Sequence, residues 1–329
     1  MMKAAFMGSS TANLDRVYAP KQREALMERM EMLPGYFSDI HDPALRDVEC
    51  LFSTWGMLQA SEEEIRACMP KLKYLFYAAG TVQAFARPFL NCGVRVFSAW
   101  QANAVPVAEY TIAQIVLALK GYFPSQAAIR KSRQAAREVF AHYPGCFDVK
   151  VGLLGCGAIG SMVAERLKAF DVEVLVFDPF LSDERAEQLH VRKTDLAEVF
   201  SVCDVVSNHL ANLPATVGII KREHLLSTKP YSTFINTGRG PQLEEKDLYD
   251  MLTMDSTRWA LLDVLTNEQH SDENPLNTLP NCLLTPHIAG SSGMEVRRMA
   301  EYMIEAFDLV TAQKPCSYEV FPKMLDTMA

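Results

Sequence analysis

The sequence lacks the features that mark disulfide-stapled or zinc-binding proteins. It has eight cysteines but no CxxC pair, and structural zinc sites use closely spaced Cys and His residues. A chain of 329 residues is also long enough to build a core without disulfides. We therefore predict free thiols, no bound metal and a cytoplasmic location.

Clusters of positive charge and long N-terminal apolar runs are missing as well. The formal net charge is −8, whereas nucleic acids and anionic membranes attract clustered Lys and Arg. The segment 1–8 holds one Lys and no apolar stretch long enough for a signal peptide or a membrane span. We expect neither nucleic acid nor membrane as a partner.

The first hundred residues alternate short apolar runs with amphipathic stretches, which is typical of an α/β domain. The composition, 49% hydrophobic and 22% charged, is that of a globular protein with material for two domains. Ser61 followed by Glu64 forms a capping-box pattern that marks a helix start. We predict strands at 4–7, 48–52, 72–79 and 94–97, and helices at 21–32 and 61–69.

A long apolar helix at 103–123 and a more polar one at 125–140 lead into a second βα series. Six strands in βα alternation predict a doubly wound parallel sheet. We place them at 149–154, 172–177, 204–207, 232–236, 260–264 and 282–285, with helices at 158–170 and 244–253. A last helix at 294–311 would return to the first domain, so we predict a discontinuous domain, 1–102 with 294–329, and an inserted domain, 103–293.

A glycine-rich turn opens the second series. A predicted strand runs directly into the GxGxxG sequence that begins a helix, and an acidic residue, Asp178, ends the next strand 18 residues after Gly160. This context is typical of dinucleotide binding, because the helix N-terminus offers free N–H groups to the pyrophosphate. The residues of the turn are Gly155, Cys156, Gly157, Ala158, Ile159 and Gly160.

Asp178 indicates which dinucleotide binds. Its carboxylate can accept hydrogen bonds from ribose hydroxyls, whereas a 2′-phosphate would meet a like charge. Pro179 follows it, and no Arg or Lys stands in the next four positions. We predict NAD rather than NADP as the cofactor. The alternative is an ordinary βα turn with a surface Asp.

Three polar side chains follow neighbouring predicted strands. Arg239 follows the fourth, Glu268 lies in the loop after the fifth, and His287 follows the sixth. Singly, each could be an ordinary loop residue. In a sheet of order 3-2-1-4-5-6, however, all three would emerge at the carboxyl edge beside the glycine turn. A fixed cation, an acid/base and a carboxylate are what the reduction of a 2-oxo acid requires.

These motifs resemble the D-isomer-specific 2-hydroxyacid dehydrogenase family, which includes D-lactate, glyoxylate/hydroxypyruvate and 3-phosphoglycerate dehydrogenases. The resemblance covers about residues 45–311 and is carried by segments 103–110, 155–160, 204–220, 236–240, 262–268 and 285–290. It implies a Rossmann NAD-binding domain and a smaller flavodoxin-like α/β substrate domain. It also implies a homodimer. The apolar helix 103–123 would fit a dimer contact, but it would fit an interdomain core equally well.

The resemblance assigns roles to the polar residues. It implies that Arg239 binds the substrate carboxylate and polarises the 2-oxo group, and that His287, paired with Glu268, is the general acid/base. Backbone N–H groups of Ala79, Gly80 and Thr81 would also bind the carboxylate; without the resemblance, Gly80 would be an ordinary turn glycine. The remaining cofactor contacts implied are His209, Leu210, Thr216, Thr237, Gly238, Asp263 and Gly290, and a polar core position is an open alternative for His209.

The sequence departs from the family pattern at a few positions. Gln269 replaces the Pro that often follows the Glu, and Val82 and Gln83 stand where an Asp is usual. These changes concern the shape of the substrate pocket. Glu268 argues against formate dehydrogenases, which have Gln there. Because no regulatory domain follows residue 329, we expect no feedback regulation by serine.

We thus predict an NAD-dependent oxidoreductase that interconverts a small 2-oxo acid and its D-2-hydroxy acid. Two alternatives remain open. One is an NAD-sensing, partner-binding protein like the co-repressors of this superfamily, which the acidic balance disfavours. The other is a dehydrogenase of an inorganic oxyanion such as phosphite.

Overall fold

The computed structural model describes residues 1–326 and divides the chain into two compact units. Unit 1 contains Met1–Asn103 and the chain from Ser291 onward, and unit 2 is Ala104–Gly290. The chain therefore leaves unit 1 once and re-enters it once. The two crossing points adjoin each other within unit 1, because Asn103 Oδ1 accepts a hydrogen bond from Ser291 N at 3.1 Å.

A six-stranded sheet forms the centre of unit 1. The strands run in the order β13-β5-β4-β3-β1-β2. All neighbours are parallel except β13, which pairs with β5 in the antiparallel sense. The five parallel strands thus have the flavodoxin-like order 2-1-3-4-5. Their bounds are β1 (Lys3–Phe6), β2 (Glu31–Met32), β3 (Cys50–Ser53), β4 (Tyr74–Tyr77), β5 (Arg95–Ser98) and β13 (Glu319–Val320).

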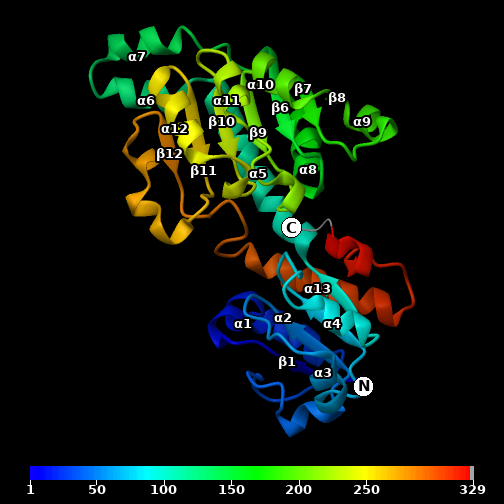
Figure 1. Ribbon diagram of the computed structural model, residues 1–329. Coiled ribbons are helices and arrows are strands. Elements are labelled where there is room, and N and C mark those ends of the chain that lie inside the picture. The colour runs from blue at the N-terminus through cyan, green and yellow to red at the C-terminus, as the bar shows by residue number, and fades with distance from the viewer. Residues whose placement is uncertain (327–329) are drawn as a thin grey trace. The chain divides into compact units, whose positions relative to one another are not determined.

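Helices cover both faces of this sheet, because its strands are apolar on both sides. On one face, Phe52, Phe76 and Phe97 stack with ring centroids 4.9 Å apart, and Val296 and Met299 of the C-terminal helix pack in the same cluster. Figure 1 shows that helix in orange beside the blue and cyan elements of unit 1. The helices are α1 (Thr11–Val17), α2 (Pro20–Met27), α3 (Glu62–Cys68), α4 (Ala86–Asn91) and α13 (Val296–Thr311).

A seven-stranded, wholly parallel sheet forms the centre of unit 2 (Figure 1). Its order is β12-β11-β10-β9-β6-β7-β8, so the direction of winding reverses between β6 and β9. In open α/β sheets, ligands bind at the carboxyl end of such a reversal. The strands are β6 (Phe147–Leu154), β7 (Asp171–Phe177), β8 (Arg192–Lys193), β9 (Val205–Asn208), β10 (Thr233–Asn236), β11 (Trp259–Leu262) and β12 (Cys282–Leu284).

Helix α5 (Trp100–Leu119) starts at the end of unit 1 and continues into unit 2. By length and composition alone it could cross a membrane, but half of its apolar window is buried in the protein, as in a core helix. The other helices of unit 2 are α6 (Tyr122–Ile129), α7 (Arg133–Phe140), α8 (Ala158–Leu167), α9 (Asp183–Leu189), α10 (Leu196–Val202), α11 (Arg222–Ser227) and α12 (Glu245–Met254). Short 3-10 turns are η1 (Pro43–Asp47), η2 (Pro214–Thr216), η3 (Gly240–Gln242), η4 (Glu268–Glu273), η5 (Pro275–Thr278) and η6 (Pro322–Asp326).

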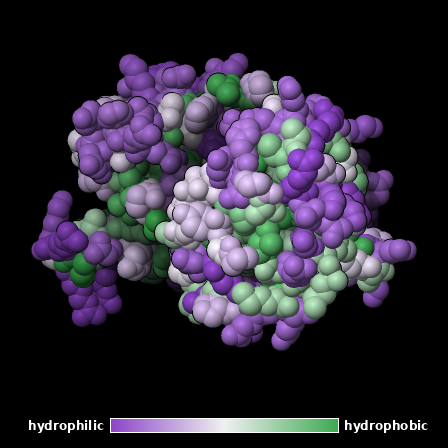
Figure 2. Space-filling view, turned by 90° about the horizontal axis from the view of Figure 1, so that it is seen from below, coloured by the Kyte–Doolittle hydropathy of each residue, from purple (hydrophilic) through white to green (hydrophobic). Residues whose placement is uncertain are grey.

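The surface mixes polar and apolar side chains. Figure 2 shows one face, on which hydrophobic residues form scattered patches among hydrophilic ones instead of a single continuous area. Isolated apolar residues of this kind are normal on protein surfaces.

The predicted α/β class and the capping box at Ser61 and Glu64 are confirmed. Three predicted helices differ most from the observed ones. The helix expected at 21–32 ends at Met27, because residues 31–32 pair with β1 as strand β2. The helix expected at 103–123 breaks at Gly121, whose φ is +61°. The one expected at 125–140 is divided into α6 and α7, and Ser132 caps the second.

The strand count was one short in unit 2. The two-residue strand β8 was not predicted, so Arg239 follows the fifth strand of this sheet and not the fourth. Because β8 lies at the far edge beyond β7, the error leaves β9 to β12 in their predicted mutual order. The helices α1 and α4 and the edge strand β13 were also not predicted.

Candidate active site

The glycine turn joins β6 to α8 in a conformation that needs glycine at two positions. Gly155 has φ +87°, and a Cβ there would lie 2.9 Å from the carbonyl oxygen of His209. A Cβ on Gly160 would lie 2.0 Å from the carbonyl oxygen of Gly155. The turn is therefore closed so tightly that the first turn of α8 touches the end of β6.

The opposite side of the turn is open. A Cβ added to Gly157 would meet no atom within 4 Å. Gly157 is the N-cap of α8 and supplies no side chain to its free N–H groups. Because α8 begins with Ala158, Ile159 and Gly160, no acidic side chain occupies its N-terminus either. Free amides and a positive helix end suit a pyrophosphate, so this turn fits a dinucleotide.

Asp178 lies directly beside this turn. Its Oδ2 accepts a hydrogen bond from Cys156 N at 2.6 Å, and its Oδ1 accepts one from Phe180 N at 2.8 Å. The carboxylate thus ties the start of the turn to the end of β7 and remains half-buried, with Pro179 exposed after it. The Cys156 thiol is buried, and burial raises its pKa, so it is not an activated nucleophile.

The residues that follow β9 pack against the glycine turn. His209 N donates to Leu154 O at 2.7 Å. The His209 ring is enclosed, with Nε2 2.9 Å from Ser207 Oγ and Nδ1 3.3 Å from Thr237 Oγ1. Burial lowers the pKa of His209 to about 3, so this imidazole is neutral. These contacts favour the core alternative for its side chain.

The loop that follows His209 closes on itself. Leu210 is buried. Thr216 Oγ1 donates to Ala211 O at 2.6 Å and accepts from Leu213 N at 3.1 Å. The Thr216 hydroxyl is therefore committed to its own turn.

Arg239 follows β10 in the segment from Thr237 to Gly240. It is half-buried, its Nη1 donates to Gly238 O at 2.7 Å, and its backbone N donates to Gln242 Oε1 at 3.1 Å. Burial lowers the pKa of Arg239 below its ordinary value, and the negative charge of Glu268 opposes this shift. A guanidinium remains protonated in proteins, so Arg239 is a fixed cation with part of its hydration removed.

Two loop residues of unit 2 form the pair that the sequence predicts. His287 Nδ1 lies 3.0 Å from both carboxylate oxygens of Glu268. His287 has a left-handed backbone with φ +55°, which is uncommon outside glycine. Its N–H donates to Asp263 O at 3.0 Å.

Asp263 holds the loop on both sides of His287. Its Oδ1 accepts from Thr285 Oγ1 at 2.6 Å and from Ile288 N at 2.8 Å, and its Oδ2 accepts from Ala289 N at 2.9 Å. The buried carboxylate is thereby engaged within the segment that ends at Gly290. In this structure Asp263 orients the His287 loop.

In unit 1, the segment Ala79–Thr81 follows β4. Ser98 Oγ donates to the carbonyl oxygens of Ala79 at 3.0 Å and of Gly80 at 2.5 Å. Within residues 1–326 the N–H groups of Gly80 and Thr81 donate to no protein acceptor. The carbonyl oxygens of Ala79 and Gly80 are bound to Ser98, and the N–H groups of Gly80 and Thr81 are free of acceptors in the described chain. The segment can therefore bind an anion.

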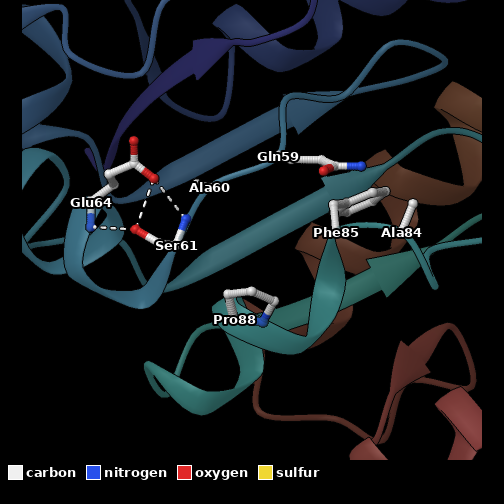
Figure 3. Close-up of a pocket in the computed structure, with 7 residues that line it drawn as sticks. All are labelled: Gln59, Ala60, Ser61, Glu64, Ala84, Phe85 and Pro88. Carbon is white, nitrogen blue, oxygen red and sulfur yellow. Dashed lines mark hydrogen bonds between the residues drawn. The ribbon is translucent and has the colours of Figure 1, made fainter.

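A separate cavity of about 330 Å³ in unit 1 is lined by Gln59, Ala60, Ser61, Glu64, Ala84, Phe85 and Pro88 (Figure 3). None of the predicted site residues lines it. Figure 3 shows Ser61 and Glu64 bonded to each other, as the capping box requires. Ser61 and Glu64 of this cavity therefore stabilise the start of α3, and we assign no ligand to the cavity.

The residues that hold the Asp263, Glu268 and Arg239 segments in place were not predicted from the sequence. Tyr110 Oη lies 3.1 Å from Thr285 Oγ1, which extends the Asp263 contacts to α5. Glu245 accepts from Thr266 N and from Asn274 Nδ2, each at 2.6 Å, and so pins both ends of the Glu268 loop. Gln242 contacts Arg239 from within unit 2. Among these supports, only Glu245, an acid in the first turn of the predicted helix 244–253, gave a local signal in the sequence.

The comparison with protein families decides the assignment. Residues 112–289 match the model described as "D-isomer specific 2-hydroxyacid dehydrogenase, NAD binding domain". The chain belongs to this family. The family and the NAD cofactor predicted from the motifs are thereby confirmed, and the matched region holds the glycine turn, Arg239, Glu268 and His287.

Curated relatives include two D-3-phosphoglycerate dehydrogenases. That of Mycobacterium tuberculosis is 32% identical over 252 residues, which is 76% of this chain and 47% of the relative. That of Methanocaldococcus jannaschii is 34% identical over 209 residues, 63% of this chain and 39% of the relative. The chain therefore spans about half the length of these relatives or less.

Solved structures share the fold over nearly the whole chain. The D-isomer-specific 2-hydroxyacid dehydrogenase of Lactobacillus delbrueckii ssp. bulgaricus, in its NAD complex, superposes with a TM-score of 0.77 at 19% identity, covering 97% of this chain and all of the other. The D-mandelate dehydrogenase of Rhodotorula graminis superposes with a TM-score of 0.80 at 17% identity, covering 97% of each chain. At this identity the likeness concerns the fold.

Proposed function

We propose that this protein is an NAD-dependent dehydrogenase that interconverts a small 2-oxo acid and its D-2-hydroxy acid. The carrying observation is the pair formed by His287 and Glu268, 3.0 Å apart, on a sheet whose neighbouring strand end bears Arg239. The sheet also carries the glycine turn at the end of β6. An acid/base, a fixed cation and a dinucleotide site thus occupy one edge of unit 2.

Arg239 is the group that would bind the substrate carboxylate. Its planar fork can reach both carboxylate oxygens, and its partial burial strengthens the attraction. The same charge draws electrons toward the 2-oxo oxygen and so favours attack at C2. Taken by itself, unit 1 offers the free amides of Gly80 and Thr81 as donors that suit an anion.

His287 is the group that would exchange the proton. Because Nδ1 faces the Glu268 carboxylate, Nδ1–H donates to it, and Nε2 is the nitrogen left to serve the substrate. In the reductive direction Nε2–H gives its proton to the alkoxide that forms at C2, and in the oxidative direction neutral Nε2 removes the proton of the hydroxyl.

NAD supplies the hydride acceptor, and NADH the hydride donor, of this reaction. The glycine turn would hold the pyrophosphate at the N-terminus of α8, and Asp178 would bind the adenosine ribose. The segment Thr237–Gly238 borders the same edge of the sheet. Asp263, whose oxygens are engaged by its own loop, would act on the reaction through His287.

A substrate panel tests this proposal. NADH oxidation is followed at 340 nm with glyoxylate, hydroxypyruvate, pyruvate and phenylpyruvate, and the product is resolved by chiral chromatography. We expect turnover by the wild type to the D-product and a loss of at least a hundredfold in kcat for His287→Gln. Wild-type rates in that variant would contradict the assigned role.

The two alternatives give different outcomes in the same assay. An NAD-sensing binding protein would bind NADH without turning over any 2-oxo acid. An oxyanion dehydrogenase would instead reduce NAD with phosphite. No specific observation favours either alternative, whereas the cation Arg239 and the acid/base His287 together suit an organic acid.

We also propose that the protein is a cytoplasmic homodimer that assembles through unit 2. Its eight thiols are all free, as in a reducing compartment. Four large apolar side chains are exposed close together in sequence: Tyr122 at 50%, Ile129 at 48%, Phe140 at 52% and Phe147 at 73%. Such a group suits a protein–protein contact. Size-exclusion chromatography with light scattering tests the dimer, and Phe140→Asp should yield monomers.

A further inference from the structure

Three buried carboxamides lie directly under the Arg239 segment. Asn208 ends β9, Asn236 ends β10, and Gln242 ends η3. Their exposures are 0%, 1% and 0%. Burying an amide is costly unless its donors and acceptors are satisfied, so their bonding pattern shows what they hold in place.

Gln242 uses its full hydrogen-bonding capacity. Its Oε1 accepts from Asn208 Nδ2 at 2.6 Å and from Arg239 N at 3.1 Å. Its Nε2 donates to Leu210 O at 2.9 Å and to Ala211 O at 3.0 Å. A carboxamide has two donors and two acceptor sites, so another orientation of this side chain would break at least one of these four bonds.

The two asparagines complete the support. Asn208 Nδ2 also donates to Asn236 Oδ1 at 3.0 Å, and that oxygen accepts from Gly238 N at 3.0 Å. Asn236 Nδ2 donates to Arg239 O at 3.3 Å. The backbone on both sides of the Arg239 side chain is thereby fixed by amides that lie beneath it.

Gly238 makes room for this arrangement. A Cβ on Gly238 would lie 2.9 Å from Asn208 Nδ2 and 2.9 Å from Gln242 Oε1. Both distances are shorter than real Cβ contacts, so the amides occupy the space that a side chain would need. Position 238, directly before Arg239, therefore lacks a side chain because the Gln242 amide occupies the space beside it.

We infer that Gln242 is a positioning residue for Arg239. Gln242 orients the Arg239 guanidinium for the substrate carboxylate and links Arg239 to the loop that begins at Leu210. This inference rests on the proposed function. Gln242 touches no reacting atom itself. It acts through the Arg239 backbone, so its loss weakens binding of the 2-oxo acid even while the rest of unit 2 stays folded.

The first experiment compares Gln242→Leu with a matched control, Asn281→Leu. Asn281 is also a buried amide of unit 2 and donates to two carbonyls, Leu252 O at 3.0 Å and Arg258 O at 2.8 Å. It precedes β12, at the sheet edge opposite to Arg239. We expect Gln242→Leu to raise KM for the 2-oxo acid at least tenfold and Asn281→Leu to change it less than twofold. Equal KM values in both variants would overturn the inference.

A double-mutant cycle separates positioning from general destabilisation. If Gln242 acts through the Arg239 side chain, adding Gln242→Leu to Arg239→Ala should change kcat/KM less than twofold. A full additional loss in the double variant would show that Gln242 acts elsewhere. Gly238→Ala serves as a second perturbation if Gln242→Leu does not fold, with the same expected rise in KM.

Amide exchange gives a readout without turnover. Gln242 is the acceptor of the Arg239 N–H, so exchange in the peptide 236–243 should quicken at least tenfold in Gln242→Leu and not in Asn281→Leu. Unchanged exchange refutes the inference. If the wild type reduces no 2-oxo acid, the proposed function fails, and amide exchange alone then decides whether Gln242 positions this segment.

Discussion

His287 Nδ1 lies at the same distance, 3.0 Å, from both carboxylate oxygens of Glu268. A contact to both oxygens fixes the orientation of the ring. The neutral amide in Glu268→Gln keeps the shape but removes the charge. We expect kcat to fall about 10²-fold, the lower end for loss of effective general acid/base catalysis.

The control for Glu268→Gln is Glu273→Gln, an exposed glutamate in the same 3-10 turn, η4. Steady-state kinetics should show no change in that variant. Equal activity of the two variants would mean that the Glu268 charge plays no part in the proton transfer.

The glycine turn makes a steric prediction about cofactor affinity. In Gly160→Ala the new Cβ would lie 2.0 Å from Gly155 O, so α8 must move away from β6 and take its free amides with it. We expect NADH affinity to fall at least tenfold in a fluorescence titration. Gly8→Ala, where a Cβ meets its nearest atom at an ordinary 3.6 Å, should bind NADH normally. Retained affinity in Gly160→Ala would contradict the assigned turn.

Asp178 makes a prediction about cofactor preference. Asp178→Ala removes the charge that would repel a 2′-phosphate and the acceptor for the ribose hydroxyls. We expect Kd for NADH to rise about tenfold, roughly the worth of a charge-assisted hydrogen bond. The ratio of NADPH to NADH affinity should rise as well. If the ratio stays constant, Asp178 does not face the ribose.

From the burial of His209 we predict that the unfolding free energy of the protein depends on pH. Burial lowers its pKa to about 3 in the folded protein, whereas an unfolded His titrates near 6.5. Between these values the unfolded chain binds a proton that the folded chain does not, so stability falls as pH falls from about 6.5 toward 3. The slope from this group is about 1.4 kcal/mol per pH unit.

The measurement for His209 is urea unfolding of the wild type and of His209→Gln at pH 7, 5.5 and 4.5. The variant lacks the titrating ring, so the difference in unfolding free energy between the proteins should narrow as the pH is lowered. A difference that stays constant across this range would show that the pKa of His209 is the same in the folded and the unfolded protein.

The sequence was informative where chemistry and local backbone geometry coincide. The glycine turn requires glycines at fixed spacing, and Arg239, Glu268 and His287 stand next to strands whose order follows from βα winding. Those strand positions could therefore be predicted without any tertiary contact. The two-residue strand β8 is too short to show alternation, which is why it was missed.

The supports of the site could not be predicted in the same way. Gln242 bonds to Asn208 and Leu210, which lie 34 and 32 residues away in the chain. No periodicity announces such a pairing, because a buried amide resembles a surface amide until its partners are known. The same holds for Glu245, whose partner Asn274 is 29 residues away.

The hydrogen bond between Asn103 and Ser291 has a consequence for how such a chain can be rebuilt. Unit 2 is an insertion whose entry and exit points already touch on the host unit, so deleting residues 104–290 leaves two ends that a very short linker can join. The same junction allows recombination: an inserted domain from a relative needs only two adjoining splice points, and each unit keeps its own sheet and core intact.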